Sequence, residues 1–155
     1  MRIESLFISP GHNFFGHYGK PPGEHPILAE QEVECVAGAG IRHDRFFNYK
    51  PDYHGQITFF SAEVFDALRR HFALGEISPG LLRRNVLLRG VELNDWIGQE
   101  FDIQGVRFLG TGEAKPCFWM NQALCEGAEE WLRGQGGLRA KILSSGTLTV
   151  DRNDA

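Results

Sequence analysis

The sequence predicts a mainly β fold, a largely antiparallel β-barrel that is closed or partly closed and carries about two helices on its outside. Seven or eight short strand patterns follow one another closely, and only two segments have helical periodicity. The chain lacks the alternating strand and helix rhythm of a dinucleotide-binding fold, and no Gly-x-Gly-x-x-Gly follows a strand pattern. A Rossmann-type oxidoreductase is therefore not expected.

The composition indicates one globular domain over residues 1–155, with 42% hydrophobic and 23% charged residues. A formal charge of -4 gives no general basic surface for nucleic acid, and no segment approaches the ~20 apolar residues that span a membrane. Cys35, Cys117 and Cys125 form no Cys-x-x-Cys pair, which favours reduced thiols over disulfides or a zinc site. We expect a cytoplasmic protein without nucleic-acid or membrane partners, and the oligomeric state is not indicated.

The N-terminal half contains three strand patterns. Residues 2–8 are rich in Ile, Leu and Phe and end at a Ser-Pro-Gly stop. Residues 30–37 alternate, which places Cys35 on the apolar face, where we expect a packing role. Residues 56–60 form a third short strand.

Two helices are expected. Ser61 is a suitable N-cap for a helix that ends near Phe72, with an apolar stripe at helical spacing. Asn121 is the expected cap of a second helix, which continues to Leu132 and ends before Gly134.

The C-terminal half is expected to form a buried strand and two hairpins. The buried strand follows the polar residues 83–85 and runs to Leu88. Residues 100–103 and 106–110 flank the two-residue turn Gln104-Gly105, and residues 138–143 and 147–150 flank Ser145-Gly146.

A loop rich in Gly, Pro, His and aromatic residues covers positions 12–26. His12, His17 and His25 have no spacing typical of a metal site, so ordinary hydrogen bonding or a cleft wall is the simpler interpretation. A lid, a dimer contact and a substrate wall all fit the composition.

The strongest candidate for chemistry is Cys117, which follows Lys115 and Pro116 on a turn. A thiolate is the nucleophilic and metal-binding form of cysteine, and a nearby cation such as Lys115 favours it. The alternative is a buried cysteine that acts as a small apolar side chain.

Two arginine clusters indicate an anion. Arg42 and Arg45 follow a glycine turn, and Arg83-Arg84-Asn85 precede the buried strand. The planar guanidinium group matches the oxygens of a phosphate. Surface salt bridges, or arginines exposed on an edge strand, are the alternatives.

Together these motifs resemble the MOSC domain. They are Gly40-Ile41-Arg42-His43-Asp44-Arg45, Arg83-Arg84-Asn85, Pro116-Cys117 and residues 137–143 with Gly146. They occur in the order and spacing of this family, which includes the C-terminal domain of molybdenum cofactor sulfurases, the mitochondrial amidoxime reducing component and small standalone bacterial proteins. The resemblance extends from Ile3 to Val150.

The resemblance implies a β-barrel with a cleft for a molybdenum-pterin cofactor or a sulfur cargo. Cys117 matches the family cysteine that ligates molybdenum or carries a persulfide. Arg83, Arg84 and Asn85 match the motif that faces the pterin phosphate, and Arg45 matches the arginine of a Gly-Asp-Arg motif. His43 replaces the usual glycine, so that either the turn has another shape or the imidazole reaches the cleft as a proton donor.

Three functions fit this resemblance. The first is a molybdenum-dependent oxidoreductase that reduces small N-hydroxylated compounds, with Cys117 as metal ligand and Lys115 beside it. A separate electron-donor protein is implied, because the sequence has no flavin or iron–sulfur motif. The second is a sulfur carrier that receives sulfur from a donor as a persulfide on Cys117, and the third is a non-catalytic cofactor-binding module. Pyridoxal phosphate is not expected, since only Lys115 and Lys141 are plausible Schiff-base lysines and neither lies in a recognisable site.

Overall fold

The computed structural model describes residues 1–10 and 27–152. The loop of residues 12–26 with its three histidines lies outside the described residues, so the predictions made for it stay predictions. The described chain contains strands, α-helices and two short 3-10 helices. The strands are β1 (Arg2–Ile8), β2 (Leu28–Glu30), β3 (Glu32–Val36), β4 (Gly40–Ile41), β5 (Ile57–Ser61), β6 (Val86–Arg89), β7 (Glu100–Ile103), β8 (Val106–Glu113), β9 (Leu138–Ile142) and β10 (Gly146–Thr149). The helices are α1 (Ala62–Phe72), α2 (Trp119–Ala123), α3 (Ala128–Trp131), and the 3-10 helices η1 (Pro79–Leu82) and η2 (Leu93–Trp96).

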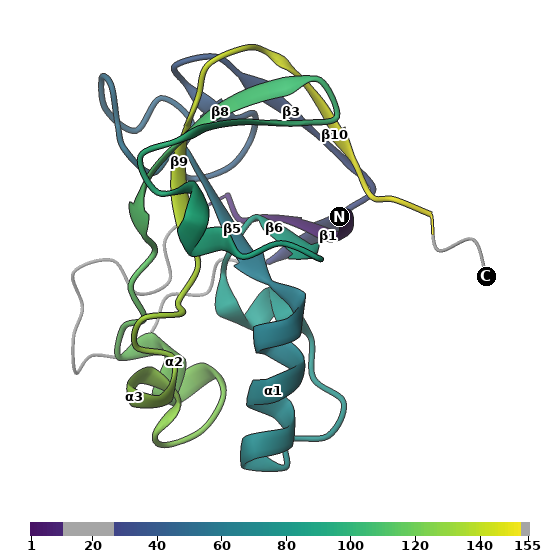
Figure 1. Ribbon diagram of the computed structural model, residues 1–155, viewed down its shortest axis with the longest axis vertical. Coiled ribbons are helices and arrows are strands. Elements are labelled where there is room, and N and C mark those ends of the chain that lie inside the picture. The colour runs from purple at the N-terminus through teal and green to yellow at the C-terminus, as the bar shows by residue number, and fades with distance from the viewer. Residues whose placement is uncertain (11–26, 153–155) are drawn as a thin grey trace.

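The strands form two sheets, and the mainly β prediction is confirmed. The larger sheet has the order β2-β1-β6-β5-β9-β8-β7, and the smaller has the order β10-β3-β4. Strands β5 and β6 pair in parallel, whereas the other strand pairs in the described residues are antiparallel. Figure 1 shows the small sheet at the opposite end of the molecule from the helices.

The mainly β fold was expected to form a closed or partly closed barrel, but the described strands form two sheets that are not closed into a barrel. The predicted hairpin between residues 138–143 and 147–150 does not form: β9 pairs with β5 and β8, and β10 pairs with β3. The amides of Leu143 and Ser144 both donate to the Arg107 carbonyl, at 2.8 and 3.3 Å, which holds this segment against β8. The chain then crosses to the small sheet, where the Ser145 hydroxyl accepts from the Ala37 amide.

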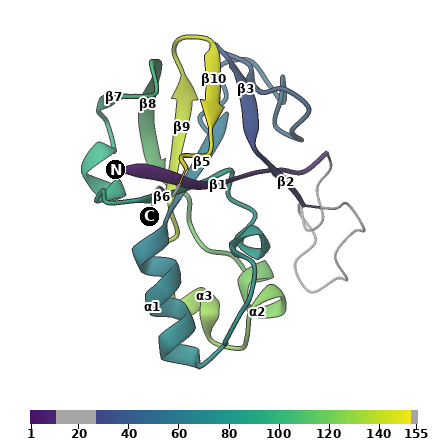
Figure 2. The ribbon, with the colours of Figure 1, turned by 90° about the vertical axis from the view of Figure 1, so that its right-hand side faces the viewer.

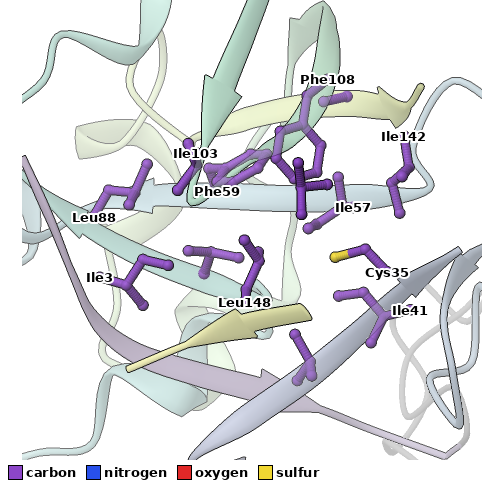
Figure 3. Close-up of a cluster of buried hydrophobic side chains, with 14 of the residues drawn as sticks. Ile3, Cys35, Ile41, Ile57, Phe59, Leu88, Ile103, Phe108, Ile142 and Leu148 are labelled. Carbon is purple, nitrogen blue, oxygen red and sulfur yellow. The ribbon is translucent and has the colours of Figure 1, made fainter. Parts of the chain in front are cut away.

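A hydrophobic core fills the space between the sheets (Figure 3). Alternation along the strands selects its members: Phe59 of β5 belongs to it, whereas its neighbour Phe60 faces the helices. Phe59 makes edge contacts with Phe101 and Phe108, at centroid distances of 5.6 and 5.4 Å. Cys35 is fully buried in this core, which confirms the packing role expected from the alternation.

A second core lies between the larger sheet and the helices. The Ser61 hydroxyl accepts from the Val64 amide and caps α1, as predicted, and Phe65 and Leu68 of this helix are buried. Figure 2 shows the three helices together beneath the strands. No helix in residues 1–10 and 27–152 is long and apolar enough to cross a membrane.

The predicted second helix is interrupted. Gly127 adopts a left-handed conformation, with φ 93°, and separates α2 from α3. Asn121 lies inside α2 rather than before it, and its side-chain oxygen accepts from the Glu129 amide at 3.0 Å. The asparagine is therefore a cap, as its residue type suggested, but it caps the first turn of the next helix.

Truncation of the central core aromatic should destabilise the fold strongly. We expect Phe59→Ala to lower the free energy of unfolding by about 3–5 kcal/mol, because a buried ring leaves a cavity. Urea unfolding followed by circular dichroism measures this loss. Leu143→Ala is the control, since Leu143 is 41% exposed and its loss should change stability by less than about 0.5 kcal/mol. Similar losses in both variants would contradict the assigned core.

Candidate functional site

A cationic pocket of about 240 Å³ lies where β5, β6 and β9 meet the loops beside them. Because β5 and β6 are parallel, the segments that precede them reach the same edge of the sheet. Five of the residues that line the pocket are Arg or Lys, and no described lining residue is Asp or Glu. The pocket is lined by Arg45, Phe46, Tyr53, Gly55, Thr58, Arg83, Arg84, Ala114, Lys115 and Arg139. Its charge suits an anion.

A buried carboxylate holds the first part of this site. Asp44 Oδ1 accepts from the Ser9 amide at 2.9 Å and from Arg45 Nη1 at 3.3 Å. Arg83 Nη2 donates to the Ser9 hydroxyl at 2.8 Å, and the Arg83 carbonyl accepts from Arg45 Nη2 at 3.3 Å. These hydrogen bonds thus hold the side chains of Arg45 and Arg83 in place at the pocket.

The positive charges in this network are not fully compensated. Burial lowers the pKa of Arg45, although the charge of Asp44 opposes the shift. Burial first, and the charge of Arg45 second, lower the pKa of Arg83 to about 10. An anion bound beside Arg45 and Arg83 would offset the cost of burying these two positive charges.

Arg84 lines the pocket, but most of its donors bind the backbone. Its Nε donates to the Gly136 carbonyl at 3.0 Å, and its Nη2 donates to the Ala114 and Lys115 carbonyls at 2.9 and 3.3 Å. Its Nη1 donates to the Leu82 carbonyl at 3.3 Å. Arg84 therefore anchors the segment that carries the cysteine, and its role toward a phosphate stays a prediction.

Cys117 lies beyond that anchored segment and is the exposed member of the three cysteines. Burial lowers the pKa of Arg84 to about 10, and the charge of Cys117 is the main influence that opposes this shift. Arg84 thus holds the backbone that precedes the thiol, and Lys115, the cation that the sequence indicated, is exposed and lines the pocket. Burial raises the pKa of the Cys35 thiol to about 12, so Cys117 is the better placed thiol for chemistry.

Three other predicted residues, Arg42, Asn85 and His43, do not line the pocket. Arg42 forms a surface salt bridge with Glu34 at 2.6 Å, which was the alternative for its cluster. Asn85 is 3% exposed, its Oδ1 accepts from the Thr58 amide and hydroxyl, and its Nδ2 donates to the Phe7 carbonyl. It therefore orients Thr58, which does line the pocket. His43 is exposed, and its φ of 74° is the left-handed conformation that a glycine permits. The backbone at His43 thus has a conformation that glycine adopts readily, and the imidazole does not line the pocket.

Sequence reasoning missed Tyr53, Thr58 and Arg139 as pocket residues. A signal for Arg139 was present, because the buried Leu138 and Ala140 flank it in β9 and alternation places it on the other face. No local pattern connects the other two to a site. Within residues 1–10 and 27–152, no group of three or more His, Cys, Asp or Glu side chains could hold a metal ion.

The fold and the site define a class of protein, an open β-sheet domain with an arginine-lined pocket and an exposed thiol two residues beyond one of its lining residues, Lys115. The family model of the MOSC domain matches residues 12–151, and the chain belongs to this family.

Solved structures share this fold at low sequence identity. The YuaD protein from Bacillus subtilis superposes with a TM-score of 0.73 and 18% identity, covering 96% of this chain and 91% of that chain. YiiM from Escherichia coli has a TM-score of 0.65 and 14% identity, covering 97% of this chain and 67% of its own. YiiM from Geobacillus stearothermophilus has a TM-score of 0.67 and 13% identity, with coverages of 96% and 70%. A search of curated protein sequences gave no match.

The cysteine segment should depend on the absence of a side chain at Gly136. A Cβ at this position would lie 2.4 Å from the Ala114 carbonyl oxygen and 2.9 Å from the Pro116 nitrogen. We expect Gly136→Ala to displace this segment and to cost about 1–3 kcal/mol in urea unfolding. Gly112→Ala is the matched control, because nothing lies within 4 Å of its Cβ position. Equal stability of the two variants would contradict the close packing of the segment.

Proposed function

We propose that the pocket binds the phosphate end of a molybdenum-pterin cofactor and that Cys117 is the molybdenum ligand. The observation that carries this proposal is the placement of five cationic residues without a lining carboxylate, next to the segment that ends in an exposed thiol. Guanidinium groups suit a phosphate, and a thiolate suits a soft transition metal. The MOSC family is associated with this cofactor, which supports the same assignment.

The described residues fit such a ligand. The volume of about 240 Å³ is small for a complete cofactor and suits a phosphate group. Arg45 and Arg83 are held rigidly by Asp44 and Ser9, so little conformational entropy is lost when they bind an anion. Arg84 would keep the Cys117 segment in place, since it ties the Ala114 and Gly136 carbonyls together.

As an enzyme, the protein would reduce small N-hydroxylated compounds such as hydroxylamines or amidoximes. The cofactor, when bound, supplies the two-electron redox chemistry. The chain itself binds the phosphate through Arg45 and Arg83, presents the Cys117 sulfur, and places the Lys115 ammonium at the pocket. Electrons would come from a separate donor protein, because the sequence has no flavin or iron–sulfur motif.

A sulfur carrier is the second candidate, and the exposure of Cys117 favours it. A thiol that receives sulfur from a donor protein must be reachable from outside. A nearby cation favours the attack of a thiolate on such a donor, and Lys115 lies two residues before Cys117. The pocket would then hold the phosphate of the acceptor.

The enzyme proposal predicts a molybdenum-dependent activity that requires Cys117. The protein purified from a cofactor-producing host should contain molybdenum by elemental analysis and should reduce a hydroxylamine when supplied with a chemical reductant. Cys117→Ala should lower the rate by at least about 100-fold, because it removes the metal ligand. Cys125→Ala should retain the activity, since Cys125 lies in the helical core rather than at the pocket. A protein without molybdenum that also fails to take up added cofactor would overturn the proposal.

The carrier proposal predicts a persulfide on Cys117. Incubation with a cysteine desulfurase and free cysteine should increase the protein mass by one sulfur atom, located on Cys117 by peptide mass spectrometry. Cys117→Ser should abolish this gain, and Cys125→Ser should not. Sulfur found only on Cys125, or on neither residue, would rule out this role.

A further inference from the structure

Arg139 extends the cationic wall of the pocket from β9. It pairs with Thr58 of β5 and Gly112 of β8, and its side chain lines the pocket. Its Nε is buried and forms no hydrogen bond to any residue in the described part of the chain. A buried N–H without a partner is costly, and a ligand oxygen would satisfy it.

His54 holds the other end of this guanidinium group. Arg139 Nη1 lies 2.8 Å from His54 Nε2, and a guanidinium nitrogen can only donate. His54 Nε2 therefore accepts, which requires a neutral imidazole with its proton on Nδ1. The backbone of His54 is fixed separately, because its carbonyl accepts from the Thr111 hydroxyl at 2.6 Å. The ring can thus change its protonation state without release of the loop.

The charges around His54 are mostly positive. Arg139 and Lys141 reach it from β9, and Lys50 reaches it from its own loop. Lys141 is paired with Asp52 at 2.8 Å, and the Tyr53 ring contacts the imidazole at a centroid distance of 4.8 Å. Burial and then these three cations lower the pKa of His54 below its ordinary value.

We propose that Arg139 is a further anion-binding residue of the pocket and that oxyanion binding there is coupled to protonation of His54. This inference rests on the proposed function of the pocket as a phosphate site, and it adds a residue and a pH dependence to that site. The ligand class is a tetrahedral dianion, such as a phosphate monoester or sulfate. Arg139 binds the anion, and His54 is a positioning residue that acts through Arg139.

Two effects make protonation of His54 and binding of the anion favour each other. Protonation turns His54 Nε2 into a donor, which breaks the hydrogen bond to Arg139 and releases Nη1 for the anion. A bound anion also offsets the cations that disfavour the imidazolium, so it raises the pKa of His54. By linkage, protonation of His54 must raise the affinity for the anion by the same factor. Affinity should therefore rise as the pH falls through the lowered pKa of His54.

The test measures sulfate binding by isothermal titration calorimetry at pH 5.5 and pH 8.0 and constant ionic strength. Sulfate is the probe because it stays a dianion throughout this range, whereas phosphate titrates. We expect the wild-type protein to bind sulfate about tenfold more tightly at pH 5.5 than at pH 8.0. Arg139→Gln should weaken binding about tenfold or more at the lower pH, because it removes a charge-assisted contact.

His54→Gln separates the charge of the imidazole from its structural role. Glutamine can accept a hydrogen bond from Arg139 but cannot be protonated, so the rise in affinity on acidification should disappear. His71→Gln is the matched control, because His71 stacks on Trp131 at the end of α1, and it should keep the rise. Circular dichroism verifies that each variant is folded.

Three results would overturn the inference: no sulfate binding by the wild type, equal affinity at both pH values, or a rise that persists in His54→Gln. The last of these results, with affinity lowered by the same factor at both pH values, would show that His54 has a merely structural role. Molybdenum plays no part in this experiment. A protein that never binds molybdenum could still pass the sulfate test, so the two proposals fail separately.

Discussion

The contacts of one half-buried arginine, Arg84, organise the candidate site. Arg84 joins the end of η1, the segment before Cys117 and the turn before β9 through the Leu82, Ala114, Lys115 and Gly136 carbonyls. These segments are far apart in the sequence, and of the four carbonyl groups only that of Leu82, at the end of η1, belongs to a helix or strand. A planar group with five donors in fixed directions is suited to this task, which an ammonium group could not perform. The position of the thiol relative to the pocket depends on this residue.

The parts of the fold that sequence predicted are those with local patterns. Alternation identified the buried face of β3 and the position of Cys35, and the Gln104-Gly105 turn correctly indicated the hairpin of β7 and β8. The barrel and the final hairpin were wrong because the partner of a strand is decided by distant residues. Arg107 binds Leu143 and Ser144, and this contact between two segments leads the chain away from β9. Nothing within residues 138–150 encodes that contact.

For the site, residue type predicted the location better than the role. Arg45, Arg83 and Arg84 of the two clusters line one pocket with Lys115, whereas Arg42 pairs with Glu34 on the surface. Whether an arginine faces a ligand or a set of carbonyls depends on which backbone groups lie unpaired around it, and local sequence does not contain this information. For the same reason the role of Asn85 was not predicted. Its side-chain amide forms hydrogen bonds with Thr58 of β5 and Phe7 of β1. Arg139 was not assigned to the site, although it lies in the motif of residues 137–143 and strand alternation gave the direction of its side chain.

The parallel pairing of β5 with β6 separates the residues of the pocket from the residues that stabilise the fold. The loops that precede these two strands therefore meet at one edge of the sheet. Most residues of the pocket wall lie in these loops, and the others lie in β5, in β9 and in the segment that follows β8. The hydrophobic residues that set strand register lie deeper, between the sheets. Loop residues tolerate replacement far better than core residues do. Ligand preference can therefore diverge between homologues by exchange of a few loop side chains, while one scaffold persists even when overall identity is as low as 13–18%.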